Sequence, residues 1–311
     1  AKVIFGNDEE DAPGFPIVRN IPGADENELR KLYKGDSFSI PTSFKKSLTW
    51  FLCVSAVQRT FGYKKPLSML IHTASIQNHH FTVYERVQYW LKHDKNILEL
   101  CKQVYEEEIY SVTLDDLLLA NPEYGFANQV ETSYPDFKQI EEEIVDLLND
   151  IRNIELGDDN SFEYGSGIHL CVDNCRANRE AEDGTYLRIV YPKDEQLNHL
   201  GKAPVFIIIG GNTLSRGLTI EGLVCTYFAR TSNLADTLMQ MARWFGYRKD
   251  YELLQRIWMT SSAVEKFEAL TKVDMDLKRE VERFMKQGIS PEKFGPRIRN
   301  IPEIAKFRIT S

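Results

Sequence analysis

Apolar residues along this chain fall into two patterns: short uninterrupted runs, and longer stretches with helical spacing. The short runs predict buried strands, because strands covered on both faces carry apolar side chains without alternation. These runs lie at residues 66–75, 167–174, 185–191, 203–210, 222–230 and 256–261. Strands of this kind that alternate with helices predict an α/β fold, with a largely parallel sheet and helices on both faces.

Helical spacing predicts the segments that connect these strands. A first helix begins at Thr42 or Ser43, places Phe44 and Leu48 on its apolar face, and ends before Gly62. Further helices are expected in four stretches of residues 81–150, at 233–247 and from Ala263 to Lys286.

The pattern divides the chain into three parts. Residues 1–40 are polar and rich in proline, so we expect an extended lead-in. Residues 41–261 carry all the expected strands in one α/β domain. The helical block at about 81–150 is too long for an ordinary crossover and is expected to be an inserted helical subdomain. Residues 262–311 are expected to form a C-terminal helical extension and an irregular tail.

Composition narrows the class of protein. The chain has 311 residues, of which 42% are hydrophobic and 27% charged, as in ordinary globular proteins. No apolar run approaches the ~18 residues that a membrane span needs, and the first residues do not have the pattern of a secretory signal. The five cysteines are scattered, which indicates reduced thiols. We therefore expect a cytoplasmic protein.

Charge is distributed unevenly along the chain. The formal net charge of −8 argues against a protein that coats nucleic acid indiscriminately. Residues 241–311 carry fifteen Lys and Arg against ten Asp and Glu, so this quarter is basic on an acidic body. Such a quarter is compatible with a nucleic-acid face, and equally with helices whose charges are solvated.

A glycine pair and polar side chains follow the most apolar strand, APVFIIIG. The stretch GGNTLSRGLTIEGL covers residues 210–223. Open α/β sheets bind ligands at the carboxyl ends of their strands, and glycine lets backbone approach a ligand closely. The connection is therefore a candidate ligand site, although a plain strand, turn and helix start is the alternative.

The segment QMARWFGYR, residues 240–248, is the second candidate. Gln240 and Arg243 are three residues apart and share a helix face, and Arg248 follows among aromatic residues. Arginines of this kind bind phosphates or bases through their planar fork. Pairing of the arginines with Asp250 and Glu252, without a ligand, is the alternative.

Together the two segments resemble a known family. SRGLTIEG and QMARWFGYR resemble motifs V and VI of superfamily 2 helicases, which line the cleft of the second RecA-like domain. The run IIIGGNTLSRGLTIEGL…YFAR…DTLMQMARWFGYR is similar to the Z1 domain family, described as helicase-related endonucleases. IPTSFKKSLTWFLCVSAVQR and SMLIHTAS are similar to that family's opening helix and first strand, so the resemblance covers roughly residues 35–260. It implies a RecA-like (P-loop NTPase-type) sheet and a place in bacterial DNA processing or defence.

The resemblance also implies roles for individual residues. The residues that would bind the nucleotide and couple it to a nucleic-acid strand are Gly211, Thr213, Ser215, Arg216, Gly217 and Glu221. Gln240, Arg243 and Arg248 would face the phosphates, where an arginine stabilises charge on the transferring phosphoryl group. The helicase pattern Gln-x-x-Gly-Arg-x-x-Arg is one residue longer than the spacing from Gln240 to Arg243. Both arginines therefore remain candidates for the catalytic role.

The sequence contains no G-x-x-x-x-G-K-[ST] segment, so it has no P-loop. The resemblance implies ATP with Mg²⁺ as cofactor, bound mainly by a P-loop RecA-like domain upstream in a parent protein. It also implies nucleic acid as a partner, DNA rather than RNA, and no membrane. We expect this chain by itself to hydrolyse little or no ATP.

Two other functions stay open: a metal-dependent endonuclease domain, and a non-catalytic interaction module with a RecA fold. Metal-dependent nucleases group acidic residues around a divalent cation. The nearest local cluster, Asp274-x-Asp276-x-Lys278, lies on a helix pattern where such charges are usually solvated. The acidic run at 141–143 indicates an exposed face.

Histidines and cysteines give no metal assignment. His72, His79 and His80 lie at and after the strand at 66–75, in a place that faces ligands in α/β folds. Cys171 and Cys175, with His169 nearby, do not have the spacing of a zinc site. We therefore assign no metal ligands.

Overall fold

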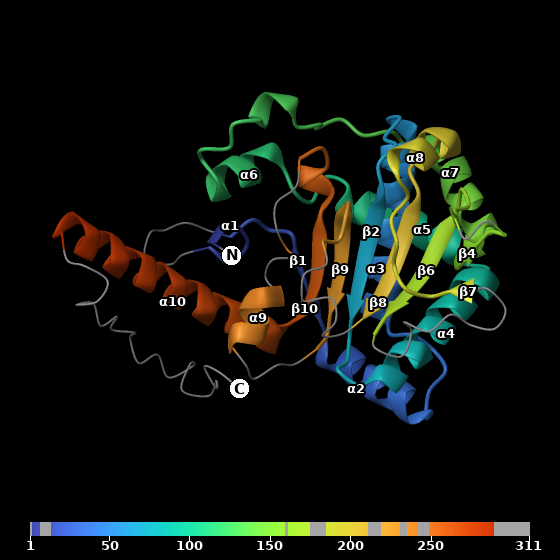
Figure 1. Cartoon of the computed structure of the whole chain (residues 1–311), viewed down its shortest axis with the longest axis horizontal. Coiled ribbons are helices and arrows are strands. Elements are labelled where there is room, and N and C mark those ends of the chain that lie inside the picture. Colours follow the sequence, from blue (N-terminus) through green and yellow to red (C-terminus); the bar gives the residue numbers. More distant parts are fainter. Residues whose placement is uncertain are drawn as a thin grey trace.

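The computed structural model describes residues 2–6, 14–158, 161–174, 185–210, 219–230, 235–241, 245 and 249–288. These residues form an α/β fold built on one seven-stranded sheet, with a long C-terminal helix that extends away from it (Figure 1). All paired strands of this sheet run parallel, as the apolar runs predict. Among the described residues, no helix combines the length and the apolar character that crossing a bilayer requires.

The strand order in the large sheet is β1-β10-β9-β2-β8-β6-β3. The strands are β1 (Val18–Ile21), β2 (Leu67–His72), β3 (Ile151–Arg152), β6 (Ile168–Asp173), β8 (Val205–Gly210), β9 (Leu223–Phe228) and β10 (Arg256–Thr260). Every residue of β2, β6, β8, β9 and β10 is buried, which explains why their sequences are continuous apolar runs. The predicted strands at 66–75, 167–174, 203–210, 222–230 and 256–261 are confirmed.

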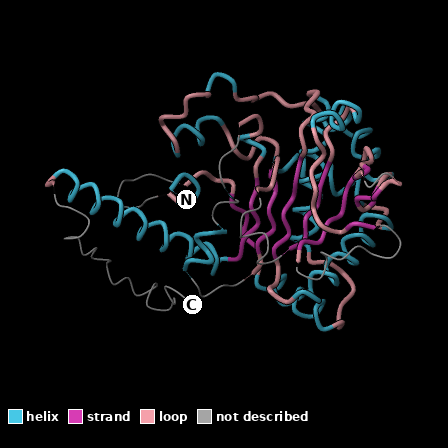
Figure 2. Tube along the Cα trace, viewed as in Figure 1, coloured by secondary structure: helices cyan, strands magenta, loops and turns pink. Residues whose placement is uncertain are grey.

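Helices cover both faces of the sheet (Figure 2). They are α1 (Lys2–Phe5), α2 (Gly23–Lys34), α3 (Thr42–Thr60), α4 (Gln77–His93), α5 (Ile97–Glu108), α6 (Leu114–Ala120), α7 (Phe137–Asn149), α8 (Asp194–Leu200), α9 (Ala235–Met241) and α10 (Ser261–Lys286). Alternate residues of β2 point to opposite faces, so Met69 joins the core with α3 and α4, whereas Leu70 joins the core with α9 and α10.

Helix α3 is buried almost all round, because it lies between the sheet and two further helices. It packs on β9 and β10 and is covered by α5 and α7. Cys53 of α3 approaches the carbonyl oxygen of Cys101 in α5, with 3.4 Å between sulfur and oxygen. The expected helices of residues 81–150 are thus present, and α4, α5 and α7 share one continuous core with the sheet.

Two expectations are wrong in detail. Residues 1–40 are not only an extended lead-in, because β1 pairs with β10 and α2 follows it. The strand is short and lies at the sheet edge, and its sequence VRNI is only half apolar, so the apolar pattern did not predict it.

Residues 185–191 were expected to form one strand, but only β7 (Thr185–Tyr186) is a strand. It joins a small second sheet with β4 (Ile154–Leu156) and β5 (Phe162–Glu163). Ile189 is apolar because it packs into the core.

Candidate functional site

The predicted site residues lie in two segments whose flanks the structure describes. Gly210 ends β8, and the residues that follow it, Gly211, Thr213, Ser215, Arg216 and Gly217, lie outside the described part of the chain. Arg243 and Arg248 also lie outside it. Gln240 is exposed in the last turn of α9, and Glu221 is exposed in the turn before β9.

The structure does not bring Glu221 to the edge of the sheet where β8 ends. Because β8 and β9 both run parallel to β2, the start of β9 and the end of β8 lie at opposite edges. The backbone N–H of Glu221 donates to the Tyr191 hydroxyl at 3.2 Å. Gly222 beside it has a φ of 58°, and a Cβ there would collide with the Pro66 carbonyl oxygen. This turn therefore packs closely at the edge of the sheet where β2, β8 and β9 begin, which we call the amino edge; the strands end at the opposite, carboxyl edge.

His72 joins the end of β8 to the residues after β9 at the carboxyl edge, where the strands of the sheet end. It is the last residue of β2, which lies between β8 and β9, and it is fully buried. Its Nδ1 lies 2.7 Å from the carbonyl oxygen of Gly210, and its Nε2 lies 3.3 Å from a guanidinium nitrogen of Arg230. Its own carbonyl oxygen accepts the backbone N–H groups of Ala229 and Arg230. One side chain thus fixes the end of β8 relative to the residues after β9.

These contacts determine the protonation of His72. The Gly210 carbonyl can only accept and the Arg230 guanidinium can only donate, so Nδ1 carries the hydrogen and Nε2 accepts. This is the neutral form of the ring. Burial, together with the charge of Arg230, lowers the pKa of His72 to about 3. His72 is therefore a neutral bridge and not a proton carrier near neutral pH.

A second buried histidine holds the loop that follows β2. His80, in the first turn of α4, has its Nε2 3.0 Å from the Ala74 carbonyl oxygen and its Nδ1 3.4 Å from the Asn174 amide nitrogen. Burial lowers the pKa of His80, although the bond to Ala74 acts in the opposite direction. Asp173, which ends β6, lies 3.9 Å from the Arg188 guanidinium. The loop between β2 and α4 is thus tied to the end of β6.

A cavity of about 210 Å³ opens beside this network. It lies among α2, the end of β2, the start of α4 and the residues after β9. Its lining includes Arg30, Tyr33, Thr73, His79 and Arg230. The Tyr33 and His79 rings stack in parallel with their centroids 4.2 Å apart and form one wall. Among the cavities the structure shows, this one lies at the carboxyl edge, where α/β sheets bind ligands.

Comparison with known families decides the assignment of the chain. The model of the Z1 domain family matches residues 43–304, which is most of the sequence. The chain belongs to the Z1 domain family. The match reaches further towards the C-terminus than the range of roughly 35–260 that the sequence motifs alone indicate, because it also includes α10. No curated protein and no solved structure matches the chain significantly.

The carboxyl edge of this Z1 domain contains residues to which the sequence interpretation gave no role. Arg230 ends the run YFAR, which contributed only to the family resemblance, and Thr73 was unassigned. Thr73 immediately follows β2, and Arg230 lies two positions beyond the end of β9; both strands are fully buried and parallel. The positional rule that selected the residues after Gly210 applies equally to β2 and β9, and it would have found them.

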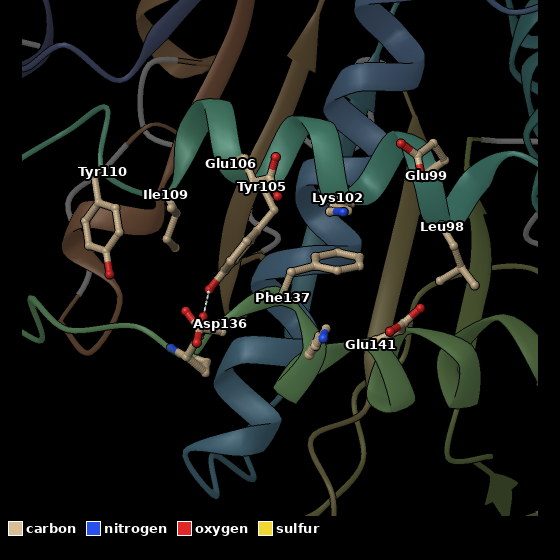
Figure 3. A pocket seen from close by; sticks show the side chains of 12 residues that line it. Leu98, Glu99, Lys102, Tyr105, Glu106, Ile109, Tyr110, Asp136, Phe137 and Glu141 are labelled. Carbon is tan, nitrogen blue, oxygen red and sulfur yellow. Dashed lines mark hydrogen bonds between the residues drawn. The ribbon is translucent and has the colours of Figure 1, made fainter.

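A larger groove of about 740 Å³ runs between α5 and the start of α7 in the Z1 domain (Figure 3). Tyr105, Phe137 and Tyr110 line it together with acidic and lysine side chains. The Tyr105 hydroxyl donates to the Pro135 carbonyl oxygen at 2.6 Å and closes part of its floor. The groove contains none of the predicted site residues, so its size does not make it the candidate site.

The charged residues weighed as nuclease ligands are paired or dispersed. Lys278 lies 2.6 Å from Asp274, and Arg279 lies 3.8 Å from Asp276, both one helical turn apart on α10. Glu143 of the acidic run pairs with Lys202 at 2.8 Å. In the part of the chain that the structure describes, no three His, Cys, Asp or Glu side chains gather closely enough to hold a metal ion.

Cys171, which lies two residues after His169, is a structural residue in this Z1 domain. Cys171 is a free thiol buried in β6, as are Cys53, Cys101 and Cys225 in their own elements. Burial raises the pKa of the Cys171 thiol far above its ordinary value. His169 is also buried, with its Nε2 accepting the Gly165 N–H at 3.0 Å. Cys175 lies outside the described residues.

Proposed function

We propose that this Z1 domain is the second, RecA-like half of a nucleic-acid-dependent NTPase. One observation supports the proposal most directly: a single buried side chain, His72, joins the end of β8 to Arg230 after β9 at the carboxyl edge. The segment that resembles helicase motif V begins at that end of β8, and the segment that resembles motif VI follows Arg230. The chain therefore leaves the same edge of the parallel sheet, the edge at which such sheets bind ligands, before it enters each of the two segments.

The proposed roles follow from the chemistry of the side chains. Arg243 or Arg248 would place its guanidinium on the transferring phosphoryl group, where a planar fork can contact two oxygens. Gln240, exposed on α9, would contribute a hydrogen bond from the same segment. Gly211, Thr213, Ser215, Arg216 and Gly217 would contact the nucleotide and couple it to the bound strand. Glu221 has no part in this site, because it lies at the amino edge.

ATP with Mg²⁺ would need a second polypeptide segment to complete the site, because the described residues suit the phosphates but not the metal. The described carboxyl edge offers arginine, hydroxyl and backbone N–H donors, which suit phosphate oxygens. It offers no group of carboxylates that suits Mg²⁺. The metal would be held by the nucleotide phosphates and by a P-loop RecA-like domain, either joined to this chain or separate from it.

Nucleic acid is the proposed partner, and the resemblance to helicase-related endonucleases favours DNA over RNA. The charge distribution agrees, because residues 241–311, which include most of the motif VI segment, are basic, whereas the rest of the chain is acidic. The setting that we propose is bacterial DNA processing or defence.

ATP hydrolysis tests the proposal. The full-length protein that carries this domain and its P-loop partner should hydrolyse ATP, and single-stranded DNA should accelerate the reaction. Arg243→Ala or Arg248→Ala should lower the rate by on the order of 10³-fold or more, because one of them is the phosphoryl contact. Arg152→Ala, at an exposed position on β3, is the matched control and should leave the rate unchanged.

Three results would contradict this function. The first is a folded protein that hydrolyses no ATP with or without DNA. The second is unchanged turnover in both arginine variants. The third is divalent-dependent cleavage of DNA by this chain alone, which would favour the nuclease interpretation.

A further inference from the structure

The cavity of about 210 Å³ at the carboxyl edge has a specific chemical character that the proposed function leaves open. Its walls come from four elements: α2, the loop after β2, the first turn of α4 and the residues after β9. The lining comes from three separate parts of the sequence, residues 26–33, 73–79 and 229–230, which meet only in the folded chain. The side chains that they contribute determine which ligand fits.

Thr73 lies in the wall of this cavity, and its hydroxyl is buried. It is the first residue after β2 and only 7% exposed. Its Oγ1 makes no hydrogen bond of ordinary geometry to any residue that the structure describes, and the same holds for the Tyr33 hydroxyl. Burial raises the pKa of Tyr33 to about 12, and the neighbouring Thr73 hydroxyl acts in the opposite direction. Buried hydroxyls without a well-formed partner are costly, so this wall is suited to a ligand that accepts hydrogen bonds.

The first turn of α4 faces the same cavity. This helix has 17 residues, and Ile76 at its N-cap has no side chain that can accept the first backbone N–H groups. The first turn contains no acidic residue. The N–H groups and the helix dipole at this end therefore favour an anion.

Arg230, after β9, supplies a formal positive charge to the lining. Its guanidinium lines the cavity and is oriented by the neutral ring of His72. The other charges in the lining, Arg30 and Glu26, lie one helical turn apart on α2 with 4.0 Å between nitrogen and oxygen, so they offset each other. The cavity thus combines one cationic fork, a helix N-terminus and a buried hydroxyl.

We propose that this cavity binds a phosphoryl group, with Arg230, the Thr73 hydroxyl and the N-terminus of α4 as its contacts. Three oxygens on one tetrahedral centre match donors that converge from different elements. The inference rests on the proposed function, because it names a further contact at the same edge. The phosphoryl group belongs either to the nucleotide or to the backbone of the nucleic acid, and the experiment distinguishes these sources.

Equilibrium binding to the full-length protein tests the inference. The probes are a fluorescent ATP analogue and a fluorescein-labelled single-stranded oligothymidine, each titrated separately. Arg230→Gln should weaken one of the two affinities by about tenfold or more, because a charge-assisted contact is lost. Thr73→Val, which keeps the shape and removes the hydroxyl, should weaken the same affinity by about threefold to tenfold. Arg152→Gln on β3 is the matched control and should change neither.

The pattern of losses identifies the source of the phosphoryl group. Loss confined to the ATP analogue assigns the cavity to the nucleotide, and loss confined to the oligonucleotide assigns it to the strand. Both affinities unchanged in folded Arg230→Gln and Thr73→Val overturns the inference, as does absence of binding by wild-type protein to either probe. Should Arg230→Gln fail to fold, Thr73→Val alone decides.

The inference and the proposed function fail in different ways. A protein that binds a probe through Arg230 but hydrolyses no ATP would retain the phosphoryl site and lose the NTPase assignment. A protein with DNA-stimulated hydrolysis and two unaffected affinities would retain the NTPase assignment and lose this site.

Discussion

Two arginines at opposite edges of one sheet differ in what surrounds them. At the amino edge, Arg256 is fully buried, and the Glu108 carboxylate, three backbone carbonyls and the Ser111 hydroxyl accept its hydrogen bonds. Its guanidinium also lies 4.9 Å from the ring centroid of Trp50. At the carboxyl edge, Arg230 is half-buried, touches a neutral histidine and borders a cavity. The same side chain thus completes the core at one edge and faces open space at the other.

The amino-edge cluster joins elements that are distant in sequence. Glu108 at the end of α5 receives bonds from Arg19 of β1 at 2.6 Å and from Arg256 of β10 at 2.8 Å. Burial alone would raise the pKa of Glu108, but the bonds and charges of the two arginines outweigh it and lower this pKa to about 2. Among the described residues that line the carboxyl-edge cavity, the carboxylate is that of Glu26, which lies 4.0 Å from Arg30 on the same helix. The comparison therefore separates a fold-stabilising edge from the edge at which we propose that ligands bind.

The largest effect on stability should come from the amino edge. Glu108→Gln removes the carboxylate that compensates Arg256, and an uncompensated buried charge costs about 3 kcal/mol. The free energy of unfolding, measured by urea denaturation, should fall by that amount. Glu107→Gln is the matched control, because its exposed pair with Lys46 is worth less than about 1 kcal/mol. Equal effects of the two variants would show that the buried cluster does not hold the fold.

Acidification should destabilise the protein in two stages that belong to different residues. The pKa of His72 is about 3 in the fold against 6.5 unfolded, and that of Glu108 is about 2 against 4.5. In both cases the unfolded chain binds the proton more readily, so stability falls as pH falls. His72, with His169 at a pKa of about 4, contributes stability that is lost from about pH 6.5 downward; Glu108 contributes stability that is lost from about pH 4.5 downward.

Unfolding free energy measured from pH 7 to pH 3 checks this order. His72→Asn should flatten the curve from about pH 6.5 down to about pH 3, whereas Glu108→Gln should flatten it only below about pH 4.5. Identical profiles for the two variants would contradict the assignment of the two stages.

The sequence predicts the centre of this fold well because burial leaves a clear pattern there. Strands β2, β8 and β9 have neighbours on both sides and helices on both faces, so nearly all their residues are apolar. The edge strand β1 contains Arg19, which points to Glu108, and its polar sequence gave no such signal. The apolar residues that follow β7, such as Ile189, pack into the core without pairing with a neighbouring strand. For this reason the sequence predicted a strand at residues 187–191 where the structure has none.

The candidate site was only partly predictable. The glycine-rich segment after β8 follows a general rule for parallel sheets, so it is visible in sequence. The link from Gly210 through His72 to Arg230 depends on which strands are neighbours, and a sequence pattern does not carry that order. Glu221 shows the reverse case: it shares a motif with Arg216, yet the chain crosses to the opposite edge before reaching it.

Hydrogen exchange of backbone amides tests the central claim, that ligands bind at the carboxyl edge, most directly. The full-length protein would be compared with and without a non-hydrolysable ATP analogue and single-stranded DNA. We expect slower exchange at residues 73–80 and in α9, with no change in β10 at the amino-edge cluster or along the groove between α5 and α7. Protection confined to that groove, or no protection at residues 73–80 when ligand is bound, would contradict the claim.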